Sequence, residues 1–283
     1  MQAIDNLQPT DQNQIMIFLQ QALGKNYKWC YIVKYGFKSN TVYRGDSLMW
    51  LLSSIVMVAG TLTVWYINYS SQSNFDTNFS TIFTYFIIGE AFIFSNAIQY
   101  DIGENIQDGK LTTKLLRPCN IFGFYICRAF GYQFFENISK LVLYLVIGIS
   151  LSKFLILPSF VGFFVFLVFC MIAYFLNTFL GIITGLGAFW FTAFFGCANF
   201  INSIKTVLSG NFFPLNAIKQ IVFLTFLPFA FTFFHPMQIY LGKYSSTEII
   251  YTFAGSIVWC LVLWLLARVI FKLGLKRNEA IGL

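Results

Sequence analysis

Charged side chains are scarce in this sequence. Asp, Glu, Lys and Arg together make up 10% of the 283 residues, whereas soluble domains carry about 25% because their surface must be hydrated. Hydrophobic residues reach 58% and aromatic residues 20%. These proportions exclude a water-soluble globular domain, and lipid is therefore the expected solvent for most of the chain.

The sequence also lacks the motifs of several kinds of chemistry. Its six cysteines form no CxxC or Cys/His metal spacing, so we expect no disulfides and neither a metal nor another cofactor in this chain. The peptide LGKN at 23–26 lacks the glycine spacing and the hydroxyl of a phosphate-binding loop, so we expect no ATP hydrolysis and no enzymatic activity. The net charge of +7 comes from basic residues that lie between apolar runs, which argues against nucleic-acid binding.

Long apolar runs predict an all-α membrane protein with six transmembrane helices. A helix needs about 20 apolar residues to cross the hydrocarbon of a bilayer. The predicted spans are residues 48–68, 80–100, 141–157, 159–180, 187–208 and 249–267. Spans 4 and 5 lie in a stretch without formal charge, and we expect the turn between them at GIITGL, residues 181–186.

Residues 214–244, between spans 5 and 6, predict a different element. Their apolar part, residues 221–234, is too short to cross and is interrupted by Pro228. A run of this length favours a re-entrant helical segment on the extracytoplasmic side. His235, the only histidine, follows this run without a carboxylate or cysteine constellation, so we assign it no chemistry.

The distribution of basic residues predicts the orientation. Fourteen of the 18 Lys and Arg residues precede the first span, lie between the second and third, or follow the last. The four on the opposite side are Lys153, Lys205, Lys219 and Lys243. Because cytoplasmic segments are enriched in Lys and Arg, both termini are expected in the cytoplasm. The first fifteen residues lack the features of a signal peptide. Residues 1–24 predict a partly disordered polar head, followed by a single membrane domain at 25–283.

An amphipathic helix is predicted at residues 25–43. Its apolar positions recur with helical spacing and are Trp29, Ile32, Val33, Gly36 and Phe37. Lys34 and Lys38 fall on the opposite face. The pattern favours a helix that lies on the cytoplasmic leaflet with its lysines facing anionic head groups. An ordinary basic segment beside the membrane is the alternative.

The cytoplasmic segment at 101–128 is much longer than a simple connection between helices, which needs about 2–8 residues. It contains the peptide DGKLTTKLLRP at 108–118, with four charges in eleven residues. The apolar positions of a short helix that Pro118 ends are Ile106, Leu111, Leu115 and Leu116. Such a ridge, flanked by charges, suggests a docking surface for a soluble partner, and a solvated loop accounts for the pattern equally well.

Four stretches of the sequence resemble the ABC-2 family of transporter permeases. NIQDGKLTTKLLRPCN at 105–120 is similar to the cytoplasmic loop I-(R/Q)-(D/E)-G-(K/R)-L-x-x-x-L-L-R-P of one subgroup. YRGDSLMWLL at 43–52 resembles the entry to its first span. FFPLNAIKQIVFLTFLPFAFTFFHPMQIYLGK at 212–243 resembles its extracellular segment, and ARVIFKLGLKRNEAIG at 267–282 its closing motif. The four stretches occur in the order of the family.

The resemblance implies one permease subunit of an ATP-binding cassette exporter in a prokaryotic inner membrane. Implied partners are two ATPase subunits, which bind ATP and magnesium, a second permease that is identical or related, and membrane lipid. The loop at 101–118 then belongs to the region that couples the permease to the ATPase. The residues that match the loop motif and carry this expectation are Gln107, Asp108, Gly109, Lys110, Leu111, Leu115, Leu116, Arg117 and Pro118.

Glu90 is the one acidic residue inside a predicted span, and it lies midway along span 2. A carboxylate at this depth faces protein or water, either as a polar contact in the translocation path or as a structural acid paired with a neighbour such as Ser95 or Asn96. An ion-coupled carrier predicts several buried ionisable groups and duplicated halves, and an intramembrane enzyme predicts paired catalytic residues; we keep both as alternatives. Dense aromatic residues at 187–195 and 223–234 favour packing in the core or against lipid, with an apolar inner cleft as the alternative.

Overall fold

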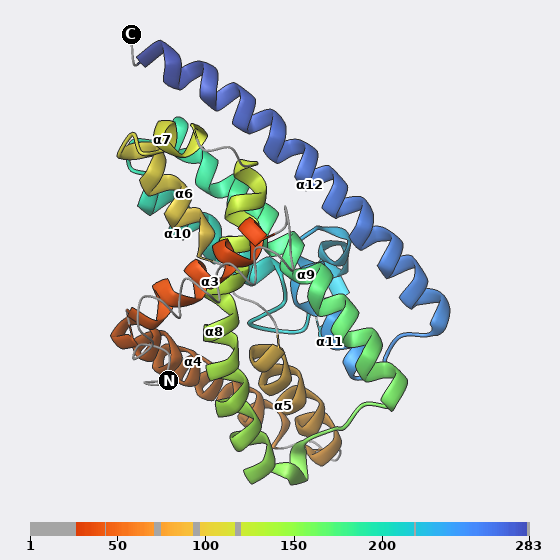
Figure 1. Ribbon diagram of the computed structural model, residues 1–283. Helices are drawn as coiled ribbons and strands as arrows, with labels where there is room; N and C mark the ends of the chain where they lie inside the picture. Colours follow the sequence, from red (N-terminus) through yellow and green to blue (C-terminus); the bar gives the residue numbers. More distant parts are fainter. Residues whose placement is uncertain are drawn as a thin grey trace.

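The residues described by the computed structural model, 27–42, 44–70, 75–92, 97–116, 120–217 and 219–281, form helices and connections without a β-strand (Figure 1). The α-helices are α3 (Tyr27–Val42), α4 (Arg44–Tyr69), α5 (Phe75–Phe92), α6 (Ile98–Gln107), α7 (Leu111–Leu115), α8 (Ile121–Ser150), α9 (Phe160–Leu186), α10 (Phe194–Leu208), α11 (Phe234–Tyr240) and α12 (Ser246–Ile281). Short 3₁₀ helices cover Ser152–Phe154, Gly187–Phe189, Leu215–Ala217, Lys219–Phe226 and Ala230–Thr232. Helices suit an apolar chain because they satisfy their backbone hydrogen bonds internally.

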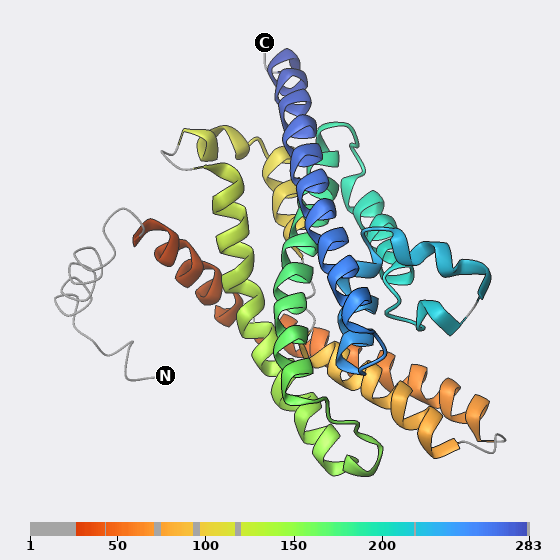
Figure 2. The same cartoon turned by 90° about the vertical axis from the view of Figure 1, so that its right-hand side faces the viewer.

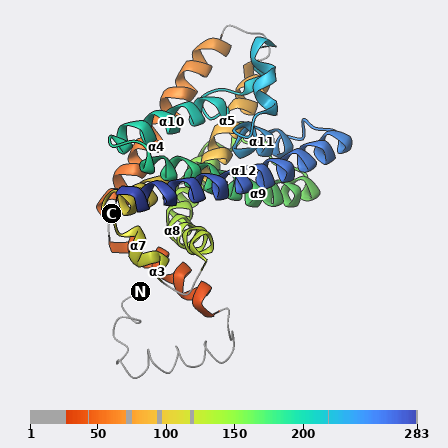
Figure 3. The same ribbon diagram turned by 90° about the horizontal axis from the view of Figure 1, so that it is seen from above.

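Two long apolar helices, α9 and α12, lie side by side (Figures 1 and 3). At the start of α12 the Ser245 amide donates to the Glu248 carboxylate at 2.7 Å, a reciprocal cap that marks where the helix begins. Helices α4, α9 and α12 contain segments long and apolar enough to cross a membrane, at Leu48–Tyr69, Phe160–Phe189 and Ser246–Arg277. These segments contain most or all of predicted spans 1, 4 and 6.

The turn between predicted spans 4 and 5 lies later than expected. Residues 181–186 belong to the last turns of α9, which ends at Leu186, and α10 begins only at Phe194. Gly185 explains the error, because a Cβ there would lie 2.8 Å from the Cβ of Ile102 on α6. This glycine allows two helices to approach closely and does not break a helix.

Predicted span 2, residues 80–100, contains parts of two helices. Helix α5 ends at Phe92 and α6 begins at Ile98, while residues 93–96, including Ser95 and Asn96, lie outside the described part of the chain. Predicted span 3, residues 141–157, is also displaced, since α8 begins at Ile121 and ends at Ser150. Ile98 and Ile106 form part of a buried stripe along α6. This stripe keeps α6 helical and packed past residue 100, where the predicted span ends. The segment 101–128 thus contains most of α6, all of α7 and the start of α8.

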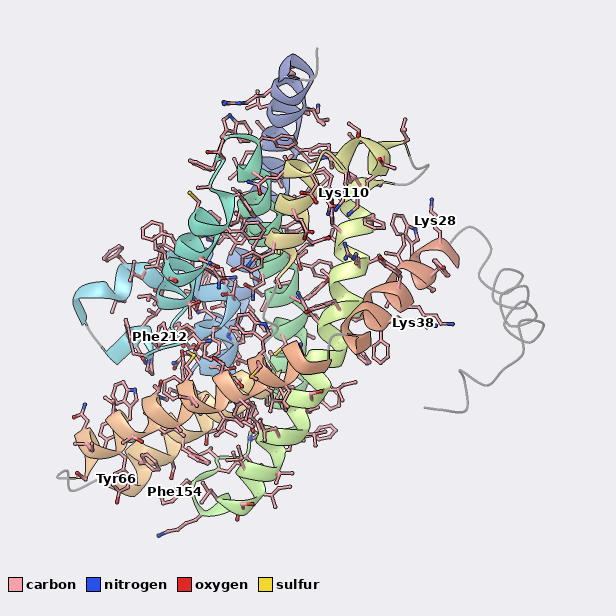
Figure 4. All side chains as sticks on the ribbon, turned by 90° about the vertical axis from the view of Figure 1, so that its left-hand side faces the viewer. Lys28, Lys38, Tyr66, Lys110, Phe154 and Phe212 are labelled. Atoms are coloured by element: carbon pink, nitrogen blue, oxygen red, sulfur yellow. The ribbon has the colours of Figure 1, made fainter. Side chains whose placement is uncertain are left out.

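Helix α3, predicted to lie on the cytoplasmic leaflet with its lysines facing the head groups, packs against α8. A Cβ on Gly36 would overlap the carbonyl oxygen of Arg128, and a Cβ on Gly131 would overlap that of Val33. Two facing glycines let these helices approach more closely than larger side chains permit. Lys38 points away from α8 (Figure 4). The amphipathic pattern therefore reports contact with a neighbouring helix.

The segment predicted as re-entrant, 214–244, is folded against α5. The hydroxyl of Tyr85 donates to the carbonyl oxygen of Gly210, just before this segment, at 2.7 Å. The ring of Phe233 fills the space above Gly89, where any Cβ would collide with it. All seven residues of α11 are buried. This packing buries the later part of the segment, whereas Phe223 and Phe226 in its earlier part are exposed.

The molecule has two distinct ends. The C-terminus, α7 and the turn after α9 lie at one end (Figures 1 and 2). Tyr66 near the end of α4 and Phe154 after α8 lie at the end opposite Lys110 (Figure 4). Phe79 joins these two aromatic rings, with centroids 5.5 Å from Tyr66 and 5.1 Å from Phe154. Tyrosine, unlike phenylalanine, is enriched where helices reach the membrane surface, so Tyr66 suits this position.

Candidate functional site

A sharp bend separates α6 from α7, and we call residues 107–116 the elbow. Gly109 has a φ of +70°, a left-handed conformation that favours glycine. Its amide donates to the carbonyl oxygen of Ile106 at 3.2 Å and closes α6. On either side, Lys110 and Asp108 form an ion pair of 2.6 Å, and this hydrogen bond to the carboxylate raises the pKa of Lys110.

The leucines of the elbow do not form one ridge. Leu111 is 1% exposed and Ile106 8%, whereas Leu115 is 40% and Leu116 86% exposed. The predicted ridge is therefore divided: its first half anchors the elbow to the protein and its second half faces outward. Helix α7 has only five residues, too few to keep a continuous apolar face. Arg117 and Pro118 lie outside the described residues.

Gln107 fastens the elbow to a second element. Its side-chain amide donates to the carbonyl oxygen of Thr192 at 2.8 Å, in the turn between α9 and α10. The elbow and this turn therefore form one surface at the end of the molecule where the C-terminus lies (Figure 1). The sequence pattern of 101–128 contains no signal for this contact.

A group of charges connects the elbow to the long helices, and we call Asp101, Lys114 and Arg128 the Asp101 cluster. Asp101 on α6 forms ion pairs with Arg128 on α8 and, at 3.9 Å, with Lys114 on α7. The ammonium of Lys114 also lies 5.5 Å from the ring centre of Phe124 and 5.2 Å from that of Tyr125. Partly buried charge pairs of this kind hold register between elements. A displacement of α7 is thus linked to α6 and α8.

A cavity of about 730 Å³ lies beside the Asp101 cluster, with Asp101 and Arg128 in its wall. Helices α4, α5, α6, α8, α9 and α10 contribute to the wall, together with residues after α10. Its polar lining includes Glu90, Gln99, Gln133, Asn177, Lys205 and Asn211. This cavity is not the apolar cleft considered for residues 187–195 and 223–234. Of those residues, only Thr232 and Phe233 line it.

Glu90 is in the wall of this cavity. It lies two residues before the end of α5 and accepts a hydrogen bond of 3.2 Å from the side-chain amide of Asn211. The prediction placed it midway along one span, whereas the structure places it near the end of α5, before α6 begins at Ile98. A carboxylate next to a polar cavity keeps access to hydrogen-bond donors, which lowers the cost of its charge.

Two lysines share the cavity with Glu90. Lys140 on α8 is 6% exposed and Lys205 on α10 is partly buried. Lys205, predicted on the extracytoplasmic side, lines the same cavity as Asp101. The charge of this residue therefore belongs to the interior of the molecule.

Several amide groups of the wall have no hydrogen-bond partner within the described part of the chain. These atoms are Oε1 of Gln99, Nε2 and Oε1 of Gln133, and Oδ1 of Asn211. Gln99 is 2% and Gln133 1% exposed. A buried amide without a partner costs about 1–3 kcal/mol, so the cavity is suited to polar contents. Sequence reasoning identified Glu90 but missed these amides, whose only signal was glutamine or asparagine inside apolar helices.

His235 holds the segment after α10 together and takes no part in the cavity. Its Nδ1 lies 2.7 Å from the hydroxyl of Tyr244, and its Nε2 lies 2.8 Å from the carbonyl oxygen of Thr225. Both ring nitrogens are engaged in internal hydrogen bonds. Over the described ranges no group of three His, Cys, Asp or Glu residues is placed to hold a metal ion.

The comparison with protein families finds a match for the sequence of this chain. The family described as ABC-2 family transporter protein matches residues 49–282. The match includes the elbow, the Asp101 cluster and every cavity residue named above. No curated protein matches the chain.

Proposed function

This chain belongs to the ABC-2 family of transporter proteins, and from that premise we propose that it is the permease subunit of an ATP-driven exporter in a prokaryotic cytoplasmic membrane. A separate ATPase, in two copies per complex, binds ATP and magnesium. A second permease chain, identical or related, supplies the other half of the path. The long apolar helices and the family match support a membrane-embedded transport component.

The proposed topology has six crossings. They are made by α4, by α5 continued in α6, by α8, α9, α10 and α12, with both termini in the cytoplasm. Helix α10 has 15 residues, which span about 22 Å and stop short of the roughly 30 Å of hydrocarbon. The following segment, 214–244, is proposed as the re-entrant part that completes this crossing from the extracytoplasmic side. The buried packing of α11 supports this role.

We assign coupling to the elbow. Leu115 and Leu116 are exposed at the proposed cytoplasmic end, and apolar side chains that face water at a helix end are suited to a groove on the ATPase. Leu111 anchors the elbow from within. Because they match the end of the loop motif, Arg117 and Pro118 are proposed to end this docking element.

The Asp101 cluster is the single observation that carries this mechanism. It connects Lys114 in the docking helix to Asp101 and Arg128, which line the cavity. Movement of α7 by the ATPase therefore changes the cytoplasmic part of the cavity wall. Glu90 and the other polar residues of the wall line the proposed translocation path. Glu90 also has a structural role, because it accepts a hydrogen bond from Asn211.

The docking role predicts that Leu115→Asp combined with Leu116→Asp releases the ATPase. Two leucines in an apolar contact contribute about 3 kcal/mol or more, which corresponds to an affinity at least about a hundredfold weaker after their loss. The measurement is the ATP hydrolysis that co-purifies with the affinity-tagged permease from membranes of the source organism. The variant should remain inserted in the membrane, because both side chains face outward.

Thr113→Asp is the matched control, since Thr113 is an exposed polar residue of the same helix. It adds a negative charge without removing an apolar side chain, and co-purification should persist. Full recovery of the ATPase with the double leucine variant would overturn the coupling role of the elbow.

A further inference from the structure

The cavity has hydrogen-bonding groups that the protein leaves unused. In the described part of the chain, the acceptors Gln99 Oε1 and Asn211 Oδ1 lack donors, and both amide atoms of Gln133 lack partners. Gln99 and Gln133 are at least nine-tenths buried and line the cavity. Hydroxyl groups satisfy such a mixed set, because each hydroxyl both donates and accepts. A hydroxylated ligand would replace the missing partners.

The cavity also contains an ammonium group, that of Lys205, which forms no ion pair with a described residue. Among the described residues the ion pairs are Lys110–Asp108, Lys114–Asp101 and Arg128–Asp101, and Lys205 takes part in none. The same wall contains three acids, Glu90, Asp101 and Glu104, and none of them forms an ion pair with Lys205. A partly buried ammonium without a counter-charge is unfavourable. An anionic group in the cavity would supply the counter-charge.

The start of α6 adds to this preference. Ala97, Ile98 and Gln99 line the cavity, and Ala97 is the N-cap of the ten-residue helix. Its methyl side chain cannot accept a hydrogen bond from the first turn, as Ser, Thr, Asp or Asn would. The N-terminal end of a helix carries about half a positive charge, so it favours an anion in the same space.

From these three features we infer that the cavity binds a negatively charged polar group with several hydroxyl groups, such as a phosphorylated polyol. The group is either the head group of a lipid or a free soluble molecule. The volume of about 730 Å³ is within the range of about 300–1,000 Å³ for small-molecule sites. The inference rests on the proposed function, because it identifies the cargo or a cargo-like ligand of the exporter path.

The test is ligand binding to the full-length permease, purified without an ATPase in detergent and observed by native mass spectrometry. The probes are palmitoyl-oleoyl phosphatidylglycerol, the zwitterionic phosphatidylcholine with the same acyl chains, and glycerol 3-phosphate. Wild-type protein should retain phosphatidylglycerol over phosphatidylcholine. Lys205→Met should weaken retention of phosphatidylglycerol about tenfold, the usual effect of losing one charge-assisted hydrogen bond.

Three further variants test the chemistry. Lys205→Arg keeps the charge and should keep binding, while Gln133→Leu removes two hydrogen-bonding atoms and should weaken it. Lys28→Met removes a lysine on the exposed face of α3 (Figure 4) and should have no effect. Displacement of the lipid by excess glycerol 3-phosphate would indicate recognition of the free polar group. Binding that depends on Lys205 without such displacement would indicate a lipid-borne group.

Equal retention of phosphatidylglycerol by wild type and Lys205→Met, or no preference over phosphatidylcholine, would overturn the inference. Because no ATPase is present, this failure leaves the coupling role of the elbow intact. Conversely, if the ATPase still co-purifies after substitution of Leu115 and Leu116, the coupling role of the elbow is overturned, and a measured ligand site is unaffected.

Discussion

A single hydrogen bond illustrates how this protein keeps a carboxylate among apolar helices. Glu90 on α5 accepts from Asn211, which follows α10 and is 121 positions away in the chain. The opposite side of the Asn211 amide, its Oδ1, has no partner in the described part of the chain. Both residues face the cavity, so the pair serves structure and the polar character of the wall together.

The pair predicts a difference between two substitutions of Glu90. Glu90→Gln retains an oxygen that accepts from Asn211, so the stability should change by less than about 1 kcal/mol. Glu90→Leu removes the acceptor and leaves the whole Asn211 amide unpaired, which should destabilise the protein by about 1–3 kcal/mol. Thermal unfolding of both variants in the same detergent measures the difference. Equal loss with Gln and Leu would show that the negative charge, and not the hydrogen bond, is required.

At the scale of helices, small residues decide which elements touch. Gly36 and Gly131 bring α3 and α8 into backbone contact, and Gly185 brings α9 to α6. In a membrane, lipid competes with helices for apolar side chains, so close packing of small residues stabilises helix pairs. The elbow depends on the same principle, because α8 and α9 position the partners of Asp101 and Gln107.

The contact between α3 and α8 predicts that Gly131→Ala destabilises the protein. Its methyl group would overlap the carbonyl oxygen of Val33, and overpacking typically costs about 1–3 kcal/mol. Gly60→Ala on α4 is the control, since a Cβ there meets nothing within 4 Å; it should be neutral or slightly stabilising because alanine favours helices. Thermal unfolding gives the stability, and hydrogen exchange of residues 27–42 should accelerate in Gly131→Ala alone. Unchanged exchange would mean that α3 is held by other contacts.

At the scale of the whole molecule, the two ends are formed by different elements. The elbow, the turn after α9 and the C-terminal basic segment share one end (Figure 1). The rings of Tyr66, Phe79 and Phe154 gather at the other (Figure 4). Because basic segments remain in the cytoplasm, the first end is the proposed cytoplasmic side and the proposed site of contact with the ATPase.

This orientation predicts opposite labelling of two cysteine variants in a chain whose six native cysteines are replaced by serine. Thr113→Cys in α7 should react with a membrane-impermeant maleimide only after the membrane is permeabilised. Ser70→Cys, at the exposed end of α4, should react in intact spheroplasts. Labelling of Thr113→Cys in intact spheroplasts would place the elbow outside and would overturn the proposed function.

The sequence by itself determined the class of the protein, because a membrane chain must consist of long apolar helices and must keep its basic residues on one side. The loop motif at 105–120 pointed to the family that the match over 49–282 shows. Hydrophobic periodicity also located the helix of residues 27–42. It could not show what covers that helix, because a pattern reports that a face is buried and not against which partner.

Only the tertiary structure decided where the helices break and what they enclose. Gly185 read as a turn, yet it lies in α9 because its missing side chain admits Ile102. Gln99, Gln133, Lys205 and Asn211 are far apart in the chain and come from different elements. They line one cavity because helix packing brings them together. The local sequence around each residue does not show which distant residues will lie beside it.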